Sequence, residues 1–139
     1  MTSSGKPPIS RVFSRTPYLL LAGDAIVLAL VTVAGFATHQ VLGAPLWRIL
    51  TTFLPLLLGW LLAGWSLGVF DLEQAKKSSQ LWRPLYAMLL AGPFATWLRS
   101  VMLGQGVVMT NFVFVMSGLS ALALLAWRVL AVIIFNRKA

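Results

Sequence analysis

The sequence contains no cysteine, a single histidine and only three acidic residues, which are Asp24, Asp71 and Glu73. The absence of cysteine excludes disulfides, thiolate metal sites, iron–sulfur clusters and cysteine nucleophiles. One histidine excludes a haem with two histidine ligands from the same chain, and with only three acids we do not expect a metal site with three or four protein ligands. We therefore expect no metal and no other cofactor.

Charge of either sign is also scarce. Only 10% of the 139 residues are charged, against about 25% in an average soluble domain. Hydrophobic residues make up 59% of the chain and its mean hydropathy is +0.87, which excludes a soluble globular domain and a disordered chain. A net charge of +8 would indicate nucleic-acid binding in a soluble protein. Here the basic residues are scattered among short loops, so we expect a membrane protein with no nucleic-acid partner.

Four apolar runs account for most of the chain. A membrane-spanning helix needs about 20 predominantly apolar residues, and the runs cover residues 18–36, 50–70, 84–103 and 107–135. The sequence thus predicts an all-α fold, an integral membrane four-helix transmembrane bundle. It forms one domain over residues 18–136, preceded by a cytoplasmic basic tail, residues 1–17. The first run is too long for a cleaved signal peptide and contains Asp24, so we expect it to remain as a span.

The distribution of lysine and arginine predicts the orientation, because these residues are enriched in cytoplasmic loops. Eight lie on the side of the two termini and of the second loop, against two on the other side. The eight are Lys6, Arg11, Arg15, Lys76, Lys77, Arg83, Arg137 and Lys138, and the two are Arg48 and Arg99. We expect both termini to be cytoplasmic.

Two opposite charges lie within the predicted spans. Asp24 is six residues past Tyr18 in the first run, and Arg128 is seven residues before Phe135 in the fourth. Each is about two helical turns from the cytoplasmic end of its span, and a lone charge at such a depth is costly. We therefore expect an interhelical Asp24–Arg128 ion pair that fixes helix register. The alternatives are a carboxylate linked to proton or substrate movement, and independent snorkelling of the two side chains.

A second group of polar residues is expected near the outer ends of the spans. They could line a small polar pocket for an anion or a lipid head group. The simpler interpretation is a set of interfacial residues that meet water and lipid phosphates, with the histidine as a hydrogen-bonding interface residue. The residues are His39, Arg48, Arg99, Gln105 and Asn111.

No catalytic template fits the sequence. A Ser-His-Asp arrangement would need Asp24 together with His39, which are expected at opposite depths. Gly104-Gln105-Gly106 is too short for a phosphate-binding loop and lacks its lysine, and no His-Glu-x-x-His occurs. We predict no catalytic residues and a protein that is not an enzyme.

The chain resembles a prokaryotic family of four-span membrane proteins known as domain of unknown function 3054. The resemblance extends from Gly23-Asp24 to Trp127-Arg128, and its other elements follow in order. These are Gly35 with His39, Pro55 with Gly59-Trp60, Arg99, Gly104-Gln105-Gly106 and Phe112-Val113-Phe114-Val115. In this family Gly35 is often followed by an arginine, where this chain has Phe36. The resemblance implies a four-helix membrane fold and no known activity.

Three functional hypotheses follow. The leading one is a non-enzymatic accessory, structural or lipid-interacting component of a prokaryotic plasma membrane. Its expected partners are the lipid bilayer and either a larger membrane complex or further copies of the chain. The first alternative is a small oligomeric transporter or permease that uses Asp24, and the second is an intramembrane enzyme that acts on lipids through His39 and Arg99.

Overall fold

A computed structural model describes residues 16–39 and 43–138 of the chain. Four long helices dominate it: α1 (Thr16–Thr38), α2 (Leu46–Ser66), α4 (Trp82–Met102) and α5 (Thr110–Lys138). Two short elements, α3 (Leu72–Ala75) and the 3-10 helix η1 (Ser78–Gln80), lie between α2 and α4. The predicted all-α fold is confirmed for the described residues. The expected basic tail lies outside them except for its last two residues, which begin α1.

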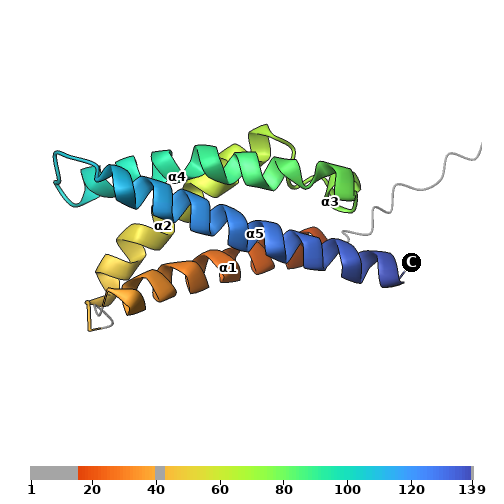
Figure 1. Cartoon of the computed structure of the whole chain (residues 1–139), viewed down its shortest axis with the longest axis horizontal. Helices are drawn as coiled ribbons and strands as arrows, with labels where there is room; N and C mark the ends of the chain where they lie inside the picture. The colour runs from red at the N-terminus through yellow and green to blue at the C-terminus, as the bar shows by residue number, and fades with distance from the viewer. Residues whose placement is uncertain (1–15, 40–42, 139) are drawn as a thin grey trace, which may run out of the picture.

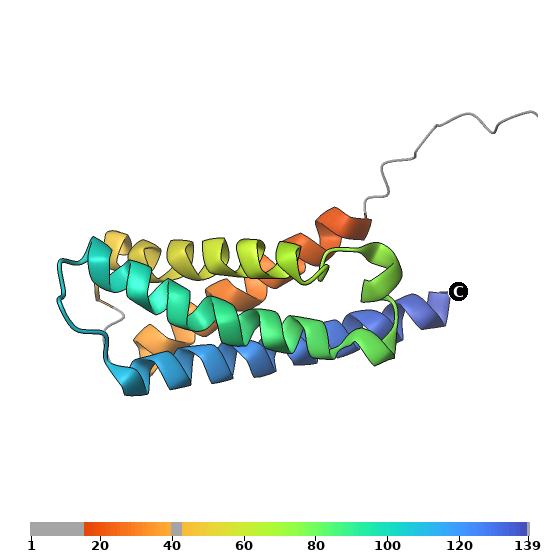
Figure 2. The same ribbon diagram turned by 90° about the horizontal axis from the view of Figure 1, so that it is seen from above.

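The long helices run alternately up and down the bundle (Figures 1 and 2). The start of α1, the α3 segment and the end of α5 lie at one end, and the turns from α1 to α2 and from α4 to α5 lie at the other. Helix α4 packs extensively against both α2 and α5, whereas α1 makes fewer contacts with α2 and α5. Figure 2 shows α1 crossing behind the other long helices.

The two tight helix ends are set by glycine. Gly68 and Gly104 both adopt positive φ, at 66° and 63°, which glycine tolerates without strain. After α2 the Val69 N–H donates to Gly64 O and the Gly68 N–H to Trp65 O, which is a Schellman motif. The second predicted span, residues 50–70, is therefore displaced: the helix ends at Ser66 and begins at Leu46, directly after Pro45.

The outside of the bundle is more apolar than a soluble protein allows. Large hydrophobic side chains are exposed along every long helix, including Leu30 at 64%, Leu90 at 62% and Leu122 at 63%. The interior contains small and hydroxyl-bearing residues among its leucines, as membrane helix bundles do. Such a surface is suited to lipid and not to water.

Three of the four long helices are long and apolar enough to cross a membrane. They are α1, α2 and α5. Helix α4 is as long as α2, with 21 residues. It is not among these candidates because Arg83 and Arg99 lie near its ends and Trp82, Tyr86 and Trp97 reduce its hydropathy. Of the four spans predicted from the sequence, the structure therefore supports three by length and hydropathy, those that correspond to α1, α2 and α5.

Candidate functional site

The most completely buried charges of the described chain face each other across the bundle. Asp24 on α1 is 0% exposed and Arg128 on α5 is 3% exposed. Arg128 Nη2 donates to Asp24 Oδ2 at 2.5 Å, and Arg128 Nε donates to Asp24 Oδ1 at 3.1 Å. The guanidinium thus engages both carboxylate oxygens in a two-point pair, the strongest arrangement for these groups. These are the two side chains that we expected to pair because they lie at similar depths in their spans.

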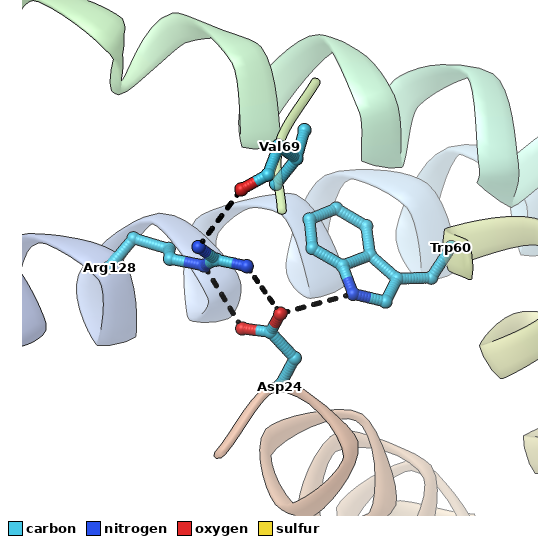
Figure 3. A network of polar contacts seen from close by, with 4 residues as sticks. All are labelled: Asp24, Trp60, Val69 and Arg128. Atoms are coloured by element: carbon cyan, nitrogen blue, oxygen red, sulfur yellow. Dashed lines mark hydrogen bonds and ion pairs between the residues drawn. The ribbon is translucent and has the colours of Figure 1, made fainter. Parts of the chain in front are cut away.

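Two further groups complete this cluster, which we call the Asp24 network: Asp24, Trp60, Val69 and Arg128 (Figure 3). The Trp60 indole N–H donates to Asp24 Oδ2 at 3.3 Å. Arg128 Nη1 donates to the Val69 carbonyl oxygen, also at 3.3 Å. The network therefore connects α1, α2, the segment after α2 and α5 through groups that are all buried.

The Val69 carbonyl can accept from Arg128 because α2 has already ended. The last carbonyls of a helix have no partner within the helix and favour nearby cations. Arg128 binds Val69 O, and Arg83 Nη1 donates to Leu67 O at 2.9 Å. Two arginines from later helices thus satisfy backbone oxygens at the end of α2, so the position of Gly68 determines where they can bind.

Close packing fixes the two indole rings beside the network. Trp60 is fully buried and lies edge-on to Phe70, with ring centroids 5.9 Å apart. Trp127 lies directly over Gly23, where an added Cβ would overlap its ring. Gly23 therefore allows α1 to approach α5 closely enough for the next residue, Asp24, to reach Arg128.

The network has little free space around it. A cavity of about 10 Å³ borders Arg128 on the side of α3 and η1 and is lined by Val69, Lys77 and Arg83 among others. That is about the space of one water molecule. Chemically the site is a neutral, closed pair: both oxygens of Asp24 accept hydrogen bonds from buried donors, and nothing larger than water fits next to it.

The second predicted group is only partly assembled. At the opposite end of the bundle, Arg99 Nε donates to Thr52 Oγ1 at 2.9 Å, and the Arg99 guanidinium lies over the Phe112 ring at 5.1 Å. Thr52 Oγ1 itself donates to Arg48 O at 3.3 Å. The positive charges of Arg48 and Arg99 repel each other. Thr52 was not singled out from the sequence, and Phe112 was named there only within the family resemblance.

The other three members of that group are not drawn into a common pocket. His39, Gln105 and Asn111 are exposed at the same end of the bundle. His39 and Gln105 form hydrogen bonds through their backbones: the His39 N–H donates to Gly35 O, and Gln105 O accepts from Ser100 Oγ. Within residues 16–39 and 43–138 these three side chains show no hydrogen bond to Arg48 or Arg99. Of the five residues that could have lined a pocket, the structure therefore brings together only Arg48 and Arg99, with Thr52 and Phe112 as their supports.

Neither Trp60 nor Val69 was assigned to a site from the sequence, where Trp60 was named only within the family resemblance, although one signal was present. Trp60 lies in the middle of the predicted span 50–70, whereas Trp47 and Trp82 lie just outside the predicted spans. A tryptophan within a span needs an acceptor for its N–H, and Asp24 lies at the corresponding depth. No sequence signal identifies the Val69 carbonyl. Among the described residues no three His, Cys, Asp or Glu side chains come close enough to hold a metal ion.

Comparison with known proteins gives one family. The family model described as "Protein of unknown function (DUF3054)" matches residues 21–131, which include Asp24, Trp60, Arg99 and Arg128. No curated protein and no solved structure matches the chain. Since the match covers most of the chain, including both arginine sites, this protein belongs to the DUF3054 family.

Proposed function

We propose that this chain is a non-enzymatic, multi-pass protein of the plasma membrane with four spans, which acts as an accessory or structural component. The observation that carries this proposal is the closure of the Asp24 network. Asp24 is the only acidic residue within a long helix, and both its oxygens are bound by Arg128 and Trp60. A group so fully engaged stabilises helix positions and offers no free atom to a substrate.

The proposal of a fourth span depends on α4. Arg83 and Arg99 are sixteen residues apart, or roughly 24 Å along the helix axis. The intervening residues, 84–98, contain no charge. Long arginine side chains near helix ends can extend to the interface while their stems remain in the hydrocarbon. Helix α4 also lies between α2 and α5, which are both apolar enough to span. These features support a crossing helix with an arginine at each interface.

The transporter alternative requires Asp24 to exchange its partner. A carboxylate that carries a proton or a cation must release Arg128 in each cycle, which would leave a buried arginine uncompensated. The enzyme alternative requires His39 and Arg99 to act together, but the His39 side chain is exposed and has no hydrogen bond to Arg99. Neither alternative gains support from a specific contact.

Cysteine labelling tests the topology on a chain that contains no cysteine of its own. In intact cells, Gln105→Cys should react with an impermeant maleimide from outside, whereas Lys76→Cys should react only after the membrane is opened. Both residues are exposed, at opposite ends of the bundle. Labelling of Gln105→Cys only from the cytoplasm would reverse the orientation, and labelling of both positions from one side would exclude the fourth span.

Purification and reconstitution test the accessory role. Affinity purification from native membranes in mild detergent should recover a larger membrane complex with this chain at fixed stoichiometry. In liposomes the purified chain alone should produce no ion or proton flux. Proton-coupled flux that is lost in Asp24→Asn but retained in Glu73→Gln, an exposed acid outside the network, would contradict the proposal and favour the transporter.

A further inference from the structure

Arg99 differs from the other two arginines that are at least partly buried in the long helices. Arg128 and Arg83 each direct a terminal guanidinium nitrogen at a protein acceptor. Arg99 uses only Nε, which donates to Thr52 Oγ1, while its guanidinium is supported by the Phe112 ring. Among the described residues neither terminal nitrogen of Arg99 has an acceptor. The side chain is thus held in place while its two NH₂ groups remain available.

Among the described residues, the charge of Arg99 has no carboxylate partner. The sequence has three acidic residues in total: Asp24 is bound to Arg128, and Asp71 and Glu73 lie at the start of α3, at the opposite end of the bundle. Arg48 is exposed one helical turn before Thr52, and its charge acts on Arg99. Two neighbouring positive charges that no described carboxylate compensates create a local positive potential that attracts an external anion.

The location of Arg48 and Arg99 in the bundle indicates which kind of anion binds to them. Trp47 precedes Arg48 directly, and Trp97 is two residues before Arg99; both indoles are 55% exposed. Exposed tryptophans at helix ends mark the head-group level of a membrane. At that level the abundant anions are lipid phosphates, and an arginine binds the non-bridging oxygens of a phosphate with two parallel N–H groups.

We infer that Arg99 and Arg48 bind the phosphate of an anionic phospholipid in the leaflet opposite the chain termini. The inference rests on the proposed function in one respect, that α2 and α4 both cross the membrane and end at this interface. Thr52 and Phe112 hold the Arg99 fork in a fixed orientation, and Arg48 supplies the second charge from α2. A lipid held there would join the ends of α2 and α4.

Native mass spectrometry of the purified full chain tests this site. The protein in detergent is titrated with phosphatidylglycerol, with phosphatidylcholine of the same acyl chains, or with inorganic phosphate. Wild-type protein should retain one phosphatidylglycerol per chain in preference to phosphatidylcholine. Arg99→Gln should weaken that retention about tenfold, because charge-assisted hydrogen bonds to the phosphate are lost. Arg99→Lys, which keeps the charge and loses the fork, should lie between the two.

Arg137→Gln is the matched control, since Arg137 is an exposed arginine at the other end of the bundle; it should retain the lipid as wild type does. If Arg99→Gln does not fold, Arg48→Gln at an exposed position carries the same test. Equal retention by wild type and the Arg48 and Arg99 variants overturns the inference, as does equal retention of phosphatidylcholine. Stabilisation by inorganic phosphate without lipid preference would assign the site to a free anion. None of these results depends on partner proteins or flux, so they leave the accessory role to its own test.

Discussion

Asp24→Asn and Arg128→Gln should each lower the free energy of unfolding by about 3–5 kcal/mol, the usual cost of removing one partner from a buried pair. Asp24→Asn leaves the buried Arg128 charge with only neutral acceptors, the new amide oxygen and the Val69 carbonyl. Arg128→Gln leaves the Asp24 carboxylate with only Trp60. Unfolding of the purified protein in mixed detergent micelles, followed by circular dichroism, measures both losses.

The double variant Asp24→Asn/Arg128→Gln decides whether the two losses have one cause. No unpaired charge remains in the double variant, so its loss of stability should be much smaller than the sum of the two single losses. The double-mutant cycle should give a coupling energy of at least about 1 kcal/mol. Glu73→Gln and Arg137→Gln, which change exposed charges, should shift stability by less than about 0.5 kcal/mol. Additive losses in the double variant would show that Asp24 and Arg128 act independently.

The Asp24–Arg128 contact could be predicted because depth in a membrane depends only on position along the chain. Counting residues from the ends of two apolar runs placed both charges about two helical turns from the same side, and few other charges compete in so apolar a sequence. The same count misplaces Trp60, because it lies ten residues before Phe70, the end of the predicted run, but only six before Ser66, where the helix ends. The hydrogen bond from its indole was missed because Trp60 was considered, from the sequence, only as part of the family resemblance.

The five polar residues near the outer ends of the spans show what residue counting does not predict. Its five members could be assigned to one end of the bundle, since all lie near the same ends of their helices. Which of them meet depends on the rotation of each helix about its axis, which the sequence does not provide for helices that are apolar on every side. Arg99 faces Thr52 and Phe112, whereas the side chains of His39, Gln105 and Asn111 are exposed.

The helix limits were predicted least well where a backbone conformation decides them. The apolar run through Phe70 gave no reason to end the second span early, because Leu67, Val69 and Phe70 are as hydrophobic as the residues before them. The positive φ of Gly68 ends the helix at Ser66. That early end frees the two carbonyls that Arg83 and Arg128 bind, so a local glycine conformation determines part of the buried site.

Two different kinds of contact hold the bundle together. Helix α1 makes fewer contacts than the other long helices, and Asp24 joins it to α2 and α5 through hydrogen bonds. Helices α2, α4 and α5 meet instead through close backbone approach. A Cβ on Gly59 would lie 2.9 Å from Ala91 O, and a Cβ on Gly92 would lie 2.6 Å from the Cβ of Ser117 and 2.9 Å from its Cα. Small residues at such crossings allow the van der Waals contact that drives helix association in lipid.

Gly92→Ala should therefore destabilise the α4–α5 contact by about 1–3 kcal/mol, the range expected when a packed interior receives an extra methyl group. The added Cβ meets the Ser117 side chain and also its Cα, so rotation of the hydroxyl alone cannot relieve the overlap. Replacing Ser117 by glycine in the Gly92→Ala background removes two of the three nearest atoms and should restore part of the loss. Gly35→Ala and Gly118→Ala are the controls, because nothing lies within 4 Å of a Cβ at either position. Alanine is favoured over glycine by roughly 1 kcal/mol within a helix, so these two variants should unfold no more easily than wild type in the same detergent assay. If Gly92→Ala behaves as the controls do, α4 and α5 do not pack through Gly92, and the arrangement of α4 between α2 and α5 would have to be revised.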